Sequence, residues 1–231
     1  MHIVNATSMV AGYTQGLRPE GREVVVVAVK GTFELVDGLK ESGGEPRLAP
    51  AQTPLVLADT FEGEPGLSAP VYESDFPPFK PMCDVLFNGS AYAPPGHPAE
   101  SVTVNLRIGP IDKSLVVVGD RVWRRGIVGV EPSASKPIAR QPFSYGTAYG
   151  GVDKPAPEPA KHKTYLENPV GIGFHPASGA DLILDTPVPN THAVGSPIRS
   201  PVGNHRAMAL GPIGRGWKPR YKHAGTYDQK W

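Results

Sequence analysis

The residues that could do chemistry in this chain are seven histidines, one cysteine and a scatter of carboxylates. The histidines are His2, His97, His162, His175, His192, His205 and His223. No two of them stand at the spacing of a metal-binding pair, and a structural zinc site needs four closely placed ligands. Residues far apart in sequence can converge, but the spacing itself predicts no metal and no other cofactor.

The candidate nucleophiles lack partners in the sequence. Cys83 has no nearby base, and the adjacent Asp84 places an anion beside the sulfur, which disfavours a reactive thiolate. A buried core cysteine is therefore the preferred interpretation. No Gly-x-Ser-x-Gly elbow occurs, so serine catalysis has no local signature either.

Carboxylates are available for a glycosidase-like acid and base pair. They include Asp75, Asp84, Asp120 and Asp228. The alternative is that these side chains cap turns or pair with arginines, as Asp120 beside Arg121 suggests. The structural interpretation is preferred, and a hydrolase or carbohydrate-active enzyme remains the alternative function.

Composition excludes several classes of partner. Lys plus Arg number 23 and Asp plus Glu 22, which argues against capture of nucleic acid or an anionic membrane. The longest apolar run, residues 24–29, is far too short to span a bilayer. The N-terminus lacks the pattern of a signal peptide, and a single cysteine fits a reducing compartment. We therefore expect a cytoplasmic protein.

Proline and glycine dominate the backbone pattern. The chain of 231 residues has 27 of each, about twice their usual combined share. They interrupt the sequence too often for long helices. We predict a single mainly β domain over residues 1–231, built of antiparallel sheets as a sandwich or a partly open barrel, with long Pro/Gly-rich loops and little helix.

Several segments read as strands. Residues 24–36 form the strongest, and its valine run at 24–29 suits burial on both faces. Asp37-Gly38 then signals a turn. Shorter strands are expected at 55–57 and 182–184.

Residues 102–108 alternate cleanly between apolar and polar side chains. With 115–118 and 121–123 they predict a three-stranded meander, in which Gly119-Asp120 makes the second turn. Trp123 would then be a core anchor of this meander.

The most irregular stretch, residues 131–200, suits long surface loops, where recognition residues concentrate. Its large rings are candidate anchors for a protein partner, because a few aromatic side chains usually dominate an interface. These are Tyr145, Tyr149, Tyr165 and Phe174. The alternative is that the motifs at 149–151 and 168–171 fold the loops over a sheet.

The order of short motifs along the chain resembles domain-of-unknown-function family 2169 (DUF2169). The likeness lies in Lys30 to Phe33, Lys80-Pro81 through Gly89, Pro95-Gly96 with Pro98, Gly119 to Arg121 with Trp123, Tyr149 to Gly151, Asn168 to Gly171 with Gly173, and Gly225 to Asp228 with Trp231. Each motif is short, but their order and spacing together are specific and cover most of the chain.

The resemblance implies a function that the residues alone do not. Members are encoded in bacterial type VI secretion clusters, beside VgrG spike and toxic-effector genes. They look like adaptors or chaperones that hold a cognate effector and help load it onto the spike, without catalysis. A structural component of the spike is a further alternative. Family domains usually continue past Gly225 to Asp228, so a shortened form or a short member is expected.

No catalytic residue carries over from that family. The motif residues are expected to be structural: Asp84, Gly119, Asp120, Arg121, Trp123, Gly150, Gly151, Asn168, Gly171, Gly173, Tyr227 and Asp228. The implied partners are a secreted effector protein and VgrG.

Overall fold

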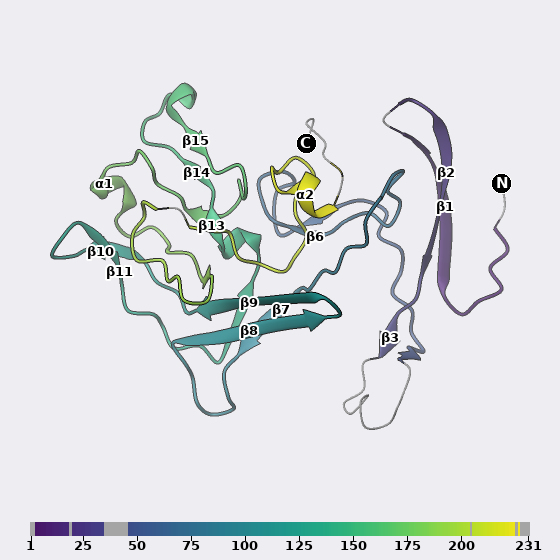
Figure 1. Cartoon of the computed structure of the whole chain (residues 1–231), viewed down its shortest axis with the longest axis horizontal. Helices are drawn as coiled ribbons and strands as arrows, with labels where there is room; N and C mark the ends of the chain where they lie inside the picture. The colour runs from purple at the N-terminus through teal and green to yellow at the C-terminus, as the bar shows by residue number, and fades with distance from the viewer. Residues whose placement is uncertain (1–2, 19, 35–45, 204, 225, 227–231) are drawn as a thin grey trace. The chain divides into compact units, whose positions relative to one another are not determined.

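The protein is mainly β in the computed structural model, which describes residues 3–18, 20–34, 46–203, 205–224 and 226 (Figure 1). Its strands form small two- and three-stranded sheets, nearly all antiparallel, and the helices of the described residues are short. The predicted mainly β class with little helix is confirmed. No helix in this part of the chain is long and apolar enough to cross a bilayer.

The residues group into two compact units, 1–60 with 72–81 and 61–71 with 82–231. The single domain expected from the sequence stays a prediction, and each unit is described by itself. In the first unit the strands are β1 (Val10–Leu17), β2 (Glu23–Lys30), β3 (Phe33–Glu34) and β4 (Arg47–Leu48). A short strand, β5 (Thr60–Phe61), lies where the chain first passes from one unit to the other.

The first unit is built around the ribbon of β1 and β2, the pair of long strands coloured purple in Figure 1. The two strands are antiparallel and in register from Val10↔Lys30 to Leu17↔Glu23. We call the face of the ribbon that packs against the rest of its unit the inner face. Gly12 and Gly16 lie on it, because side chains such as Phe76 and Pro78 come very close there. A Cβ at Gly12 would lie 2.7 Å from Leu55 Cδ1.

Burial of the valine run on both faces, as predicted, is wrong. Along β2 the exposure alternates, and Val25, Val27 and Val29 are exposed while Ala28 is buried. The reason is that, among the described residues of its unit, side chains pack against the inner face of this two-stranded ribbon and leave the outer face exposed. The predicted turn at Asp37-Gly38 lies outside the described residues.

No strand forms at 55–57, contrary to prediction. The segment is held by a carboxylate instead of a ladder: Val56 N donates to Asp75 Oδ2 at 2.7 Å, and Asp75 N donates to Val56 O. Asp75 Oδ2 also accepts from Lys30 Nζ at 3.0 Å. Asp75 therefore joins this segment to the end of β2.

The second unit holds the remaining elements. Its strands are β6 (Pro70–Tyr72, whose last residue belongs to the first unit), β7 (Gly89–Tyr92), β8 (Ser101–Ile108), β9 (Ile111–Val118), β10 (Trp123–Arg125), β11 (Val130–Pro132), β12 (Arg140–Phe143), β13 (Tyr149–Gly150), β14 (Val152–Asp153), β15 (Lys163–Thr164), β16 (Ile172–Gly173) and β17 (Thr191–His192). Its helices are the 3₁₀ turns η1 (Tyr145–Thr147) and η2 (Pro159–Lys161) and the α-helices α1 (Ala180–Ile183) and α2 (Arg220–Ala224). The strand predicted at 182–184 is wrong, because Leu182 and Ile183 belong to α1.

The hairpin of β8 and β9 confirms the alternation predicted for residues 102–108. Val102, Val104 and Leu106 pack against a core that includes Leu115, Val117 and other buried side chains. The third strand of the meander is wrong. β9 pairs on its other side with β17, whereas β10 leaves the sheet and pairs with β11.

Candidate functional site

The predicted binding loops are folded around one buried amide. Asn168 is fully buried, and its Nδ2 donates to Tyr145 O at 2.8 Å and to Tyr149 O at 3.1 Å. Its backbone carbonyl accepts from Gly151 N at 2.8 Å. Two glycines, Gly150 and Gly151, bring the chain this close, with φ values of +154° and +98° that side-chain-bearing residues rarely adopt.

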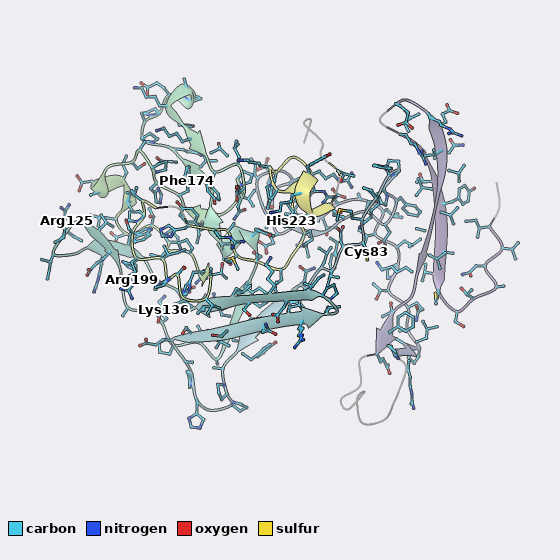
Figure 2. All side chains as sticks on the ribbon, viewed as in Figure 1. Cys83, Arg125, Lys136, Phe174, Arg199 and His223 are labelled. Atoms are coloured by element: carbon cyan, nitrogen blue, oxygen red, sulfur yellow. The ribbon has the colours of Figure 1, made fainter. Side chains whose placement is uncertain are left out.

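Three of the four aromatic candidates meet in one cluster. Tyr149 packs edge-to-face on Tyr165 at 5.2 Å and on Phe174 at 6.2 Å, measured between ring centroids. Tyr149 is 2% exposed and lies in a buried core with Trp123, while Tyr165 and Phe174 are partly buried against that core (Phe174 is labelled in Figure 2). Burial raises the pKa of Tyr149 to about 12, with a smaller contribution from Tyr165.

The fourth candidate belongs to another core. Tyr145 is 7% exposed and meets Trp217 edge-to-face at 5.4 Å, beside the buried Ala69 and Ala209. Burial raises its pKa to about 12.

Two of the four rings, Tyr145 and Tyr149, are buried, and the other two, Tyr165 and Phe174, are partly exposed. A contact residue needs its ring open to a partner, and Tyr145 and Tyr149 present almost none of theirs. A binding role for these residues, and for the stretch 131–200, stays a prediction.

The motif at 119–123 is a structural corner. Gly119 is buried, and a Cβ there would collide with the carbonyl oxygen of Lys136. Asp120 accepts from Asn190 Nδ2 at 3.1 Å and from Gln141 Nε2 at 3.4 Å rather than pairing with Arg121. Trp123 is fully buried, but it does not anchor the predicted meander, because it lies in a separate core with Tyr149 and Ile183. Among the described residues its indole N–H has no acceptor.

The remaining motif residues divide between packing and surface. Gly171 and Gly173 lie tightly against Ala148 O and Pro189, as structural glycines should. Asp84 is half-buried next to Cys83, and Cys83 is exposed, so the predicted burial of this cysteine is wrong. It lies in a surface segment without regular structure. Tyr227 and Asp228 lie outside the described residues.

One serine, histidine and aspartate do converge, a grouping that the sequence analysis missed. Asp153 is fully buried, with His175 Nδ1 at 3.7 Å from its Oδ1 and the Ser178 hydroxyl hydrogen-bonded to the same oxygen. Asp153 Oδ2 accepts from Ala177 N at 2.8 Å and Ser178 N at 3.2 Å. The hydroxyl donates to the carboxylate instead of the imidazole, so no base is set to activate it. The group clamps a loop.

Within the described residues, no three His, Cys, Asp or Glu side chains gather as a metal site would require. Burial lowers the pKa of His175, against the opposing effect of the Asp153 charge. The imidazole is therefore neutral near pH 7, which again fits a structural clamp.

The surface that sequence analysis missed is the outer face of the β1–β2 ribbon. It exposes five large apolar side chains: Tyr13 (41%), Leu17 (60%), Val25 (52%), Val27 (56%) and Val29 (60%). Tyr13 pairs directly with Val27 across the strands, so these side chains adjoin. A hollow of about 450 Å³ lies at the end of the ribbon where β1 finishes and β2 begins, and it is lined by residues 15–17 and 23–25. Nothing in the sequence signalled this face, because the valines at 24–27 are continuous and do not alternate with polar residues.

The fold and these surfaces define a mainly β protein whose described residues hold buried structural motifs and an exposed apolar sheet face. The chain belongs to the family described as "Uncharacterized protein conserved in bacteria (DUF2169)", which matches it over residues 20–231. The family named from the motifs is therefore confirmed. No curated protein and no solved structure matches the chain.

Proposed function

We propose that the protein is a type VI secretion adaptor or chaperone that binds a cognate toxic effector and helps load it onto the VgrG spike. Family membership is the starting point, because the resemblance of its motifs to DUF2169 implies this role. The mechanism is non-covalent: a preformed surface holds the effector until loading, with no turnover. The protein acts in the cytoplasm, before secretion.

The single structural observation that supports a binding role is the outer face of the β1–β2 ribbon. Isolated apolar residues are common on surfaces, but adjoining ones on one sheet face mark interaction sites. In the part of the chain that the structure describes, β1 and β2 pair only with each other, so their outer edges can add a strand from a partner. An effector segment that is extended and apolar on one side would fit both features.

The test begins with a pull-down from the native bacterium and mass spectrometry of the bound proteins. The wild-type protein should recover a secreted effector, either together with VgrG or in a complex that excludes VgrG. The double variant Val25→Thr, Val27→Thr should lose it, since threonine keeps the β-branched shape but removes apolar surface.

A matched control is available on the hairpin of β8 and β9. Ile108 and Ile111 are also β-branched, exposed and paired across strands. Ile108→Thr, Ile111→Thr should bind like wild type. Recovery of no type VI secretion protein would refute the adaptor role, whereas equal binding by both double variants would refute only the assigned face.

A further inference from the structure

A hollow beside β17 is lined by cationic and polar side chains. It has a volume of about 300 Å³ and lies within the second unit. His192, His205 and Arg206 line it with the Ser196 hydroxyl, and Ile198 and Val194 supply apolar wall. Among the described residues that line it there is no carboxylate.

Arg206 supplies the fixed charge in this hollow. Each imidazole already uses one ring nitrogen on a backbone carbonyl: His192 Nδ1 lies 2.8 Å from Ala193 O, and His205 Nε2 lies 3.0 Å from Ser200 O. The guanidinium is in none of the ion pairs found among the described residues. A guanidinium presents a planar fork of donors that matches an oxyanion.

Two further cations near the hollow also lack acidic partners in the described part of the chain. Arg121 donates to Pro189 O at 2.9 Å and Lys113 to Ala209 O at 2.6 Å, so each is held by a backbone carbonyl. Burial lowers the pKa of both groups. Arg121 repels the charged form of His192, and Arg206 does the same to Lys113. Each of the two further cations therefore interacts with a group that lines the hollow.

Arg206 gives a hollow with no carboxylate among its described lining residues a positive potential, and low-dielectric walls concentrate that potential. Arg121 Nε is in addition a buried donor that finds no acceptor among the described residues. Arg121 and Lys113 are half-buried, whereas Arg206 is exposed. Half-buried charges are costly unless an opposite charge compensates them.

We propose that this hollow is a binding site for an oxyanion, a carboxylate or phosphate group, with Arg206 as its principal ligand. The oxyanion comes either from a small molecule or from the carboxylate of a bound peptide chain. The site stands on the geometry of the second unit and does not rest on the proposed adaptor function.

Isothermal titration of the full chain tests the site with succinate, inorganic phosphate and two short peptides that differ only in a free or amidated C-terminus. Saturable binding is expected from succinate and phosphate if the source is a small anion. Binding of the free-carboxylate peptide alone, and not its amide, would assign the site to a chain terminus. Either result supports an oxyanion site.

The variant Arg206→Gln should weaken that binding by about 10-fold or more, as expected for loss of a hydrogen bond to a charged group. Arg199→Gln is the matched control, because Arg199, labelled in Figure 2, is also exposed and does not line the hollow. It should change affinity by no more than about 2-fold, as for an exposed charge. Both variants should melt like wild type.

The absence of saturable binding by every probe would overturn the proposal. Equal binding of the free and amidated peptides, without binding of either anion, would do the same. So would equal weakening by the two arginine variants, since that would mean a diffuse charge effect.

Discussion

Replacing Asn168 by alanine should destabilise the second unit more than any exposed polar substitution. The amide of Asn168 donates to the carbonyls of Tyr145 and Tyr149 from a fully buried position. Tyr145 O also accepts from Ala148 N at 3.3 Å, so it keeps a partner after the substitution. The substitution therefore leaves chiefly the carbonyl of Tyr149 without its donor.

The magnitude follows from these two contacts. A buried carbonyl left unsatisfied costs about 1–3 kcal/mol, and the second hydrogen bond contributes about 0.5–1.5 kcal/mol. Together they predict a loss of about 1.5–4.5 kcal/mol in the free energy of unfolding. For a chain of this size each kcal/mol lowers Tm by roughly 2–4 °C. We therefore expect Tm to fall by roughly 3–18 °C.

Urea unfolding followed by tryptophan fluorescence measures this loss, because Trp123 and Trp217 report on the cores of the second unit. Asn105→Ala is the control. Asn105 is exposed on β8, and its side-chain amide donates to Asp112 Oδ1 and to the Ser114 hydroxyl. It should change stability by no more than about 0.5 kcal/mol. If Asn168→Ala is as mild as this control, the role of Asn168 as the buried tie of these loops is refuted.

Three further outcomes are expected. Trp123→Ala should cost about 3–5 kcal/mol in unfolding free energy, because its ring is fully buried; an unchanged melting curve would contradict this. The double substitution of Tyr145 and Tyr165 to Ala should lower Tm, because both rings pack in or against a core. Loss of the effector from a double variant with wild-type Tm would instead support the binding alternative. The NMR titration midpoint of His175 should lie below pH 6.5, because burial lowers its pKa. The unfolded chain then binds more protons than the folded chain. The stability that neutral His175 contributes is therefore present above pH 6.5 and is lost as pH falls through the folded pKa. A midpoint above 6.5 would mean that the Asp153 charge outweighs burial.

Local patterns were sufficient for the parts of the fold that depend on neighbours in sequence. The alternation at 102–108 predicted β8 and its buried side, since the pleat sends successive side chains to opposite faces whatever the partner. The Pro and Gly content predicted little helix. Gly119, Trp123 and Asn168, which the motifs marked as structural, are buried.

What covers each face was decided by residues far away in the chain. The valine run of β2 reads as a doubly buried strand, yet only one side of its ribbon meets Leu55 and Phe76. The third strand beside β9 is β17, from more than 70 residues later, rather than the adjacent β10. Alternation determines which side chains share a face. Whether that face is buried depends on which distant segments cover it, and covering it has the entropic cost of closing a loop. The same holds for the hollow at Arg206, whose walls become a site only when the chain after β17 folds back on itself.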